Sequence, residues 1–307
     1  MRIESGTRVG RPAVDPPSPA MLRIGISGWT YKGWRGVFYP ADLTHKRELD
    51  YASTQFNSIE INGTHYSLQR PSSFASWYSQ TPPDFLFSIK GSRFITHMKK
   101  LRGVEAALAN FFASGVLALR EKLGPFLWQL PPSLGFDAER LEAFFELLPR
   151  DTDAAAALAI RHDERLIGRA YVEAGPHRKL QHCLEVRHRT YLTPAFFELL
   201  RRHDIAFVFA DTSGKWPYAE DLTSDFVYIR LHGAEQLYVS GYTDQELDWW
   251  AARIRHWSRG VQPPDATLIG SAQVNPAPIR DVFVYFDNDA KVKAPFDAKR
   301  LRERLES

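Results

Sequence analysis

Several carboxylates and one histidine stand where apolar stretches of the sequence end, and side chains of these types can carry acid–base chemistry. The four candidates for catalysis are Glu60, Glu185, Asp211 and His232. Two carboxylates in unlike surroundings can take opposite roles, one as general acid and the other as general base. We therefore interpret Glu60 or Glu185 as the acid or base. His232 would shuttle a proton, and Asp211 would orient the substrate or accept a hydrogen bond from it.

Three cationic side chains in similar positions could bind an anion. Lys90, Arg187 and Arg230 each lie near the end of an apolar run, and a guanidinium group binds carboxylate or phosphate through paired hydrogen bonds. Other polar and aromatic side chains could complete a binding site, since aromatic rings can stack on a sugar or a base. These further candidates for substrate binding are Trp29, Asn62, Tyr66, His97, Gln129 and Asn288.

The spacing of these residues places several of them on shared faces of strands. Residues two apart on a strand point to the same side, and the pairs with this spacing are Glu60 and Asn62, Ser88 and Lys90, Glu185 and Arg187, and Arg230 and His232. Unpaired charges beneath a layer of helices are costly, so we expect these faces to point into the mouth of a barrel. The same charges could instead neutralise one another as a buried ion-pair network, and His232 could be a hydrogen-bonded core histidine.

A metal ion is the less favoured ligand for this set of side chains. Glu60, Glu185, Asp211 and His232 could together supply oxygen and nitrogen ligands, which leaves a divalent metal as an alternative. The sequence has no HExxH pattern, and the cations at the same strand ends favour an anionic ligand. We predict no metal and no cofactor.

The composition excludes some classes of protein and fits others. The 307 residues carry a net charge of +3 with no dominant basic tract, so nothing requires a nucleic-acid partner. A single cysteine, Cys183, fits a reducing compartment, and we interpret it as a buried thiol. No apolar run approaches the roughly 18 residues of a membrane span, and residues 1–20 resemble a disordered leader rather than a signal peptide. We expect a cytoplasmic protein with no membrane partner.

Strands and helices alternate along the predicted chain. Strands are predicted over 22–27, 57–62, 85–90, 126–130, 181–186, 205–210, 226–231 and 281–286, and helices over 45–54, 71–80, 103–123, 137–148, 194–202, 244–257 and 297–305. Strands that are apolar along their length are typical of a parallel sheet covered on both faces, and eight such units favour a (β/α)8 TIM barrel. We predict one barrel domain over 21–307, with 151–178 left open between helix, strand and loop. An open doubly wound sheet is the alternative, although residues 27–33 do not match the GxGxxG pattern.

The motifs around these strand ends resemble a known family. They are Ile24-Gly25-Ile26-Ser27-Gly28-Trp29, Phe56-Asn57-Ser58-Ile59-Glu60-Ile61-Asn62, Gln129-Leu130-Pro131-Pro132, Glu185-Val186-Arg187-His188, Tyr228-Ile229-Arg230-Leu231-His232-Gly233 and Tyr285-Phe286-Asp287-Asn288-Asp289. Over residues 22–304 the chain resembles the YecE-like family of bacteria and archaea, known as domain of unknown function 72. The resemblance implies a TIM barrel without a settled activity. The chain differs from the family pattern at His65, at Thr190-Tyr191 and at Asp287.

Taken together, these observations favour an enzyme that acts on a small polar or anionic substrate, such as a sugar or a phosphate compound, at the mouth of the barrel. Hydrolase, lyase and isomerase chemistry all stay open. The alternative is a protein that binds or processes nucleic acid, by analogy to endonuclease IV-like barrels. A binding module without chemistry is a third reading, and the sequence does not predict an oligomeric state.

Overall fold

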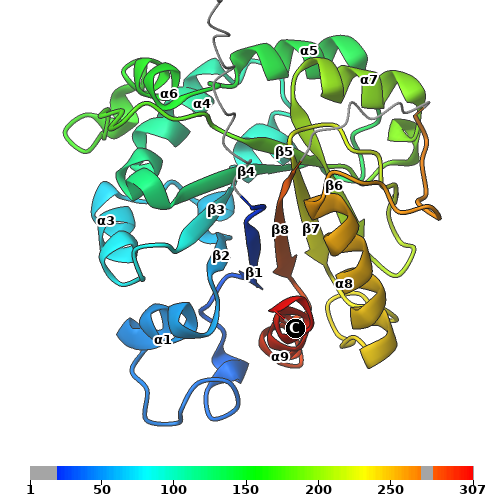
Figure 1. Cartoon of the computed structure of the whole chain (residues 1–307). Coiled ribbons are helices and arrows are strands. Elements are labelled where there is room, and N and C mark those ends of the chain that lie inside the picture. The colour runs from blue at the N-terminus through cyan, green and yellow to red at the C-terminus, as the bar shows by residue number, and fades with distance from the viewer. Residues whose placement is uncertain (1–18, 271–278, 307) are drawn as a thin grey trace, which may run out of the picture.

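The eight predicted strands are all present and close into a parallel barrel. A computed structural model describes residues 19–270 and 279–306, and within these ranges the strands follow one another in chain order around the barrel (Figure 1). They are β1 (Leu22–Ser27), β2 (Ser58–Ile61), β3 (Leu86–Lys90), β4 (Leu123–Gln129), β5 (His182–Glu185), β6 (Ile205–Asp211), β7 (Phe226–Leu231) and β8 (Asp281–Phe286). Strand β8 pairs with β1 and closes the ring. The predicted (β/α)8 fold is therefore confirmed, whereas the predicted leader lies, apart from residues 19 and 20, outside the described residues.

Helices surround this barrel on its outside (Figure 1). In the described part of the chain they are α1 (Glu48–Gln55), α2 (Gly63–Tyr66), α3 (Pro71–Ser79), α4 (Glu105–Ala113), α5 (Ala138–Leu147), α6 (Thr152–Ala159), α7 (Pro194–Arg202), α8 (Asp244–Ser258) and α9 (Ala294–Glu306). The local sequence explains several helix starts. Helices α3 and α7 begin with proline, which is well suited to the first turn. A capping box of Thr243 and Glu246 begins α8.

The predicted helix over 103–123 is wrong in its second half. Helix α4 ends at Ala113, because Gly115 has a φ of +118° and a Cβ there would lie 2.6 Å from Pro71 Cα. Only glycine adopts this backbone and allows this approach without strain. A 3-10 segment, Val116–Lys122, follows, and β4 begins at Leu123 rather than at 126.

Residues 151–178, which the sequence left open, begin with a helix and continue as loop. Asp151 caps α6, because its Oδ1 accepts a hydrogen bond from the Ala154 backbone N–H at 2.7 Å. A short 3-10 turn, Glu164–Leu166, follows before the chain returns to β5. Between β6 and β7, residues 212–225 form no helix.

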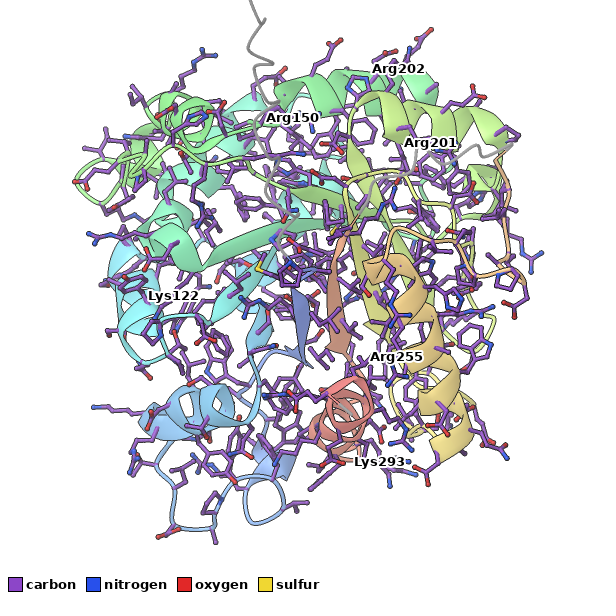
Figure 2. The ribbon with its side chains drawn as sticks, viewed as in Figure 1. Lys122, Arg150, Arg201, Arg202, Arg255 and Lys293 are labelled. Carbon is purple, nitrogen blue, oxygen red and sulfur yellow. The ribbon has the colours of Figure 1, made fainter. Side chains whose placement is uncertain are left out.

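Two hydrophobic clusters hold the barrel together. The larger one lies between the strands and the helices, and side chains fill this layer (Figure 2). The smaller one fills the lumen with residues that include Leu127, Cys183, Val208 and Tyr228. Cys183 is fully buried there, and burial raises the pKa of its thiol. The prediction of a buried structural thiol is confirmed.

Apolar helices long enough to cross a membrane do not occur among the residues that the structure describes.

Candidate active site at the barrel mouth

Lumen-facing side chains from six strands meet above the apolar filling of the barrel. The strand register sets Ser27 opposite Glu60 and Gln129 opposite Glu185. Below them, Ser88 on β3 meets the Tyr228 hydroxyl on β7 at 2.6 Å, which shows that this face of both strands points inward. Side chains two apart on a strand point to the same side. Lys90 and Arg230, two residues after Ser88 and Tyr228, therefore also point into the lumen, one layer closer to the mouth. The predicted direction of these pairs is confirmed.

Arg230 occupies the centre of this layer and is fully buried. Its Nε and Nη2 donate to the two oxygens of Glu60 at 3.1 and 2.8 Å, a bidentate pair. Its Nη1 donates to Glu185 Oε2 at 2.8 Å, and its Nη2 also donates to Asp287 Oδ2 at 2.9 Å. One guanidinium group therefore binds three carboxylates, which is the buried ion-pair network that the sequence analysis held as an alternative.

Glu185 has further partners that keep it ionised. The Gln129 side-chain amide donates to both of its oxygens, at 2.9 and 3.0 Å, and Arg187 Nε donates to Oε1 at 3.0 Å. Burial alone would raise the pKa of Glu185, but the charges of Arg187 and Arg230 outweigh burial and hold this pKa well below its ordinary value. Glu185 is therefore a fixed anion rather than a group that exchanges protons.

His232 belongs to the same network. Its Nε2 lies 3.3 Å from Arg230 Nη1 and its Nδ1 lies 3.1 Å from Asp287 Oδ2. Because arginine can only donate, Nε2 accepts and we assign the ring hydrogen to Nδ1, facing Asp287. The side chain is fully buried and its Nε2 accepts a hydrogen bond from Arg230, so His232 is a core histidine of this network with Nδ1 facing Asp287.

A cavity of about 650 Å³ opens directly above this network. Six of the residues predicted from the sequence line it, namely Trp29, Asn62, Tyr66, Lys90, Gln129 and Arg187. Glu60, Glu185, Arg230 and His232 do not line it and lie beneath. The structure thus divides the predicted site into a cavity wall and a buried support.

Three other predicted residues lie outside both groups. Asp211 accepts a hydrogen bond from the Tyr242 hydroxyl at 3.0 Å, and burial raises its pKa. Asn288 donates to Ser240 O and to Asp297 Oδ2, both at 3.0 Å, and thereby fixes the segment after β8. His97 lies in a single π-helical turn, Phe94–Met98, with its ring 5.2 Å from that of His65.

Several residues that line the cavity were not among the predicted site residues. They include Thr30, Tyr31, His65, Gln69, Tyr238, Asp287 and Asp289. A signal existed for the last two, because they stand two apart directly after β8 and so share a face. No such signal marked His65, whose Nδ1 lies 2.8 Å from Gly91 O. Burial, reinforced by the charge of Lys90, lowers the pKa of His65 to about 3, so this side chain is neutral and its Nε2 can accept a hydrogen bond.

Asp287 and Asp289 have opposite pKa shifts. Burial would raise the pKa of Asp287, but the charge of Arg230 and the hydrogen bond from His232 outweigh burial and place this pKa below its ordinary value. For Asp289, burial together with the negative charge of Asp287 outweighs a hydrogen bond from Tyr31 and the charge of Arg230, and raises the pKa to about 6. Among these carboxylates, Asp289 is the one that can gain and lose a proton near neutral pH.

The coupling between these two carboxylates predicts a measurable shift. In protein labelled with ¹³C-aspartate, we expect the Asp289 carboxyl resonance to titrate with a pKa of about 6. Asp287→Asn removes the neighbouring negative charge, so it should lower the pKa of Asp289 toward the ordinary aspartate value. An Asp289 pKa that does not move in this variant would contradict the electrostatic explanation.

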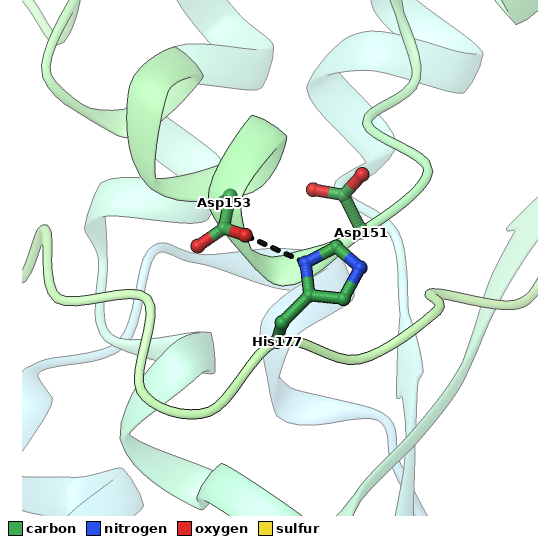
Figure 3. Close-up of side chains that lie close together, drawn as sticks. All are labelled: Asp151, Asp153 and His177. Atoms are coloured by element: carbon green, nitrogen blue, oxygen red, sulfur yellow. Dashed lines mark hydrogen bonds and ion pairs between the residues drawn. The ribbon is translucent and has the colours of Figure 1, made fainter.

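The described residues contain one close group of possible metal ligands, and it is remote from the mouth. Asp151 immediately precedes α6, Asp153 lies in the first turn of α6 and His177 precedes β5, and the three side chains lie close together (Figure 3). His177 Nδ1 is 2.6 Å from Asp153 Oδ2, and both side chains are well exposed. Exposed groups of this kind are common without an ion, and we assign no metal to it.

The chain is similar to proteins from several bacteria. Residues 23–307 match the family model described as protein of unknown function DUF72. The UPF0759 protein YecE of Escherichia coli K12 is 25% identical over 253 residues, which cover 79% of this chain and 84% of that protein. The UPF0759 protein YunF of Bacillus subtilis 168 is 21% identical and covers 93% of this chain and 95% of that protein. A crystal structure of a DUF72 family protein from Thermotoga maritima superposes with a TM-score of 0.72 at 25% identity, covering 94% of this chain and all of that one. The predicted resemblance is confirmed, and the chain belongs to the DUF72 family.

Proposed function

We propose that the protein is an enzyme that binds a small anionic substrate in the mouth cavity and acts on it by general acid–base chemistry. The observation that supports this most directly is the pair Asp287 and Asp289. The two carboxylates line one cavity, and the pKa of Asp287 is lowered whereas that of Asp289 is raised to about 6. Divergent pKa values in one cavity are a common feature of sites that transfer protons.

Asp289 takes the catalytic role that the sequence analysis gave to Glu60 or Glu185. Both oxygens of Glu60 are hydrogen-bonded to Arg230, and Glu185 is bound by Arg187, Arg230 and Gln129. A substrate in the cavity touches neither carboxylate. At pH 7 a group with a pKa of about 6 is mostly ionised, so Asp289 would act as a general base and its conjugate acid would return the proton.

Arg187 is suited to bind the anionic part of the substrate. Its guanidinium stacks 3.7 Å from the Trp216 ring centroid, and its Nη2 donates to the Tyr238 hydroxyl at 3.3 Å. These contacts and the Glu185 pair fix the group in the cavity wall. Its Nη1 makes no hydrogen bond to any residue that the structure describes, which leaves donors for a carboxylate or phosphate.

Aromatic rings offer a contact surface for the carbon skeleton of the substrate. Trp29, Tyr66 and Trp77 line the cavity, and the Trp29 and Trp77 rings pack edge to face at 5.4 Å. The exposed fraction of Tyr66 is 69%, so its ring can contact a ligand without breaking a packed core. Rings arranged in this way suit a small sugar-like or other polar carbon chain.

Anion binding tests the proposal without knowledge of the reaction. We expect inorganic phosphate and glucose 6-phosphate to bind with a change in tryptophan fluorescence, since Trp29, Trp77 and Trp216 lie at the site. Arg187→Gln should weaken this binding about tenfold or more, the loss of one charge-assisted contact.

The matched control for this experiment is Arg189→Gln, because Arg189 is an exposed neighbour that does not line the cavity. It should bind like the wild type. Equal binding by the wild type and Arg187→Gln, or no binding of either compound by the wild type, would contradict the proposal.

A further inference from the structure

Lys90 is the one group at the mouth whose surroundings the ion-pair network does not explain. Its exposed fraction is 7%, and it lines the cavity. Arg187 and Arg230 each pair with carboxylates, but the Lys90 ammonium makes no hydrogen bond and no ion pair within the described residues. An ammonium that is removed from water without a partner is costly to the fold. A contact with the substrate would offset this cost.

The burial of Lys90 favours the neutral form of its amine. Burial lowers the pKa of Lys90, and the nearby Arg230 lowers it further, while Asp287, Glu60 and Glu185 act in the opposite direction. Arg230 donates hydrogen bonds to all three carboxylates and so offsets part of their negative charge. A neutral amine is a poor ligand for an anion but a good nucleophile, and desolvation beside another cation is a known way to activate a lysine.

We propose that Lys90 forms a covalent imine with a substrate that carries a ketone or aldehyde group. This inference rests on the proposed function and adds the substrate class, a small carbonyl compound that also bears an anionic group. Arg187 would hold the anion, and the carbonyl carbon would lie over Lys90 Nζ. Both side chains line the same cavity.

The proton transfers of this reaction suit Asp289. The Nζ lone pair forms the C–N bond while the carbonyl π electrons move to oxygen. The Asp289 carboxylate accepts a proton from the nitrogen and returns it to the oxygen, which gives a carbinolamine. The nitrogen lone pair then expels the hydroxyl group, which takes a second proton that Asp289 has gained from solvent water and leaves as water. The products are a protonated imine and one water, and no oxidant or reductant takes part.

Reductive trapping tests this inference on the full chain. We would incubate the protein at pH 7 with sodium cyanoborohydride and either pyruvate or dihydroxyacetone phosphate, and then map the modified lysines by mass spectrometry. Lys90 should be modified at least about tenfold faster than exposed lysines such as Lys32, because each unit by which its pKa is lowered raises the neutral fraction about tenfold. Inorganic phosphate should slow the modification by competing for Arg187.

Lys122 provides an internal control in the same sample (Figure 2). It is also buried, and burial also lowers its pKa, but its Nζ donates to Tyr78 O and Thr81 O, both at 2.7 Å. It lies immediately before β4, away from the mouth, and should stay unmodified. Lys90→Arg keeps the positive charge but cannot form an imine, so this variant should lose the fast adduct. Lys90→Met is the second variant if the arginine does not fit.

The outcomes separate this inference from the proposed function. If Lys90 reacts no faster than exposed lysines with either probe, or if Lys90→Arg retains the fast adduct, the imine is wrong. Phosphate binding that still depends on Arg187 would then leave the anion site and its acid–base chemistry standing. If phosphate binding does not depend on Arg187, the proposed function is wrong as well.

Discussion

Replacement of Arg230 by methionine is expected to destabilise the protein by about 4 kcal/mol or more, the cost of removing one partner from a buried ion pair. Arg230 is fully buried and is the shared hydrogen-bond donor to Glu60, Glu185 and Asp287. Methionine fills a similar volume but leaves three carboxylates without this cation. Urea unfolding followed by tryptophan fluorescence would measure the loss.

The pH dependence of this variant gives a second and more specific readout. In the wild type, Glu185 and Asp287 have lowered pKa values, so their contribution to stability is present above the unfolded pKa of about 4 and is lost as the pH falls below it. Without Arg230, Asp287 loses the charge that lowers its pKa most and burial raises this pKa instead, so protonation of Asp287 favours the folded state, whereas Arg187 still pairs with Glu185. The variant should therefore become more stable as the pH falls from 7 toward 5, whereas the wild type should not.

Two control variants test the cause. Arg47→Met removes an exposed pair with Asp50 at 3.2 Å and should cost at most about 0.5 kcal/mol. Arg230→Lys keeps the charge but loses the bidentate geometry, so its stability should lie between the wild type and Arg230→Met. An Arg230→Met protein that unfolds at the same urea concentration as the wild type would show that the network contributes little.

The sequence predicted the barrel because its strands are short, apolar and regularly separated. Each of the eight predicted strands corresponds to a strand of the structure, within a few residues at its ends. The alternation of side chains also predicted correctly that Lys90, Glu185 and Arg230 point inward. The helix over 103–123 was wrong because its Ala- and Leu-rich composition favours a helix throughout. What interrupts it is the packing of Gly115 against Pro71, a tertiary contact that no local pattern encodes.

The sequence could not indicate which carboxylate would face the cavity, because this depends on how deep each side chain lies in the barrel lumen. Glu60 and Asp289 both stand near a strand end. Glu60 lies level with the Arg230 guanidinium and is neutralised by it, whereas Asp289 lies in the wall of the cavity above. Which carboxylate meets Arg230 depends on the packing of side chains across the barrel. The ion-pair interpretation is therefore confirmed for the buried layer, and the active-site interpretation stays a prediction that applies to the cavity wall above it.

This layering links stability to the proposed chemistry. Arg230 holds Asp287 ionised, and the negative charge of Asp287 in turn contributes to the raised pKa of Asp289. The buried network is thus a fixed set of charges that shifts the pKa values of the carboxylates in the cavity above it.

Replacement of Asp289 by asparagine is expected to lower kcat by about 100-fold to 10,000-fold, the usual contribution of a general base. Asparagine has nearly the same shape but cannot take up a proton. In the wild type the rate should fall as the pH drops through about 6, because the base is then protonated. This limb of the pH profile should be absent from Asp289→Asn. A panel of small keto acids and sugar phosphates, with products detected by mass spectrometry, would supply the substrate for both measurements.

Asp281→Asn is the matched control for this prediction, since Asp281 stands at the other end of the same strand. Its Oδ1 accepts a hydrogen bond from the Met21 backbone N–H at 2.8 Å, and an asparagine oxygen can do the same. This variant should turn over like the wild type and keep the limb near pH 6. If Asp289→Asn also keeps the wild-type turnover rate and the limb near pH 6, Asp289 is not the base. Another titratable group of the cavity wall, such as the Lys90 amine, would then have to take the proton.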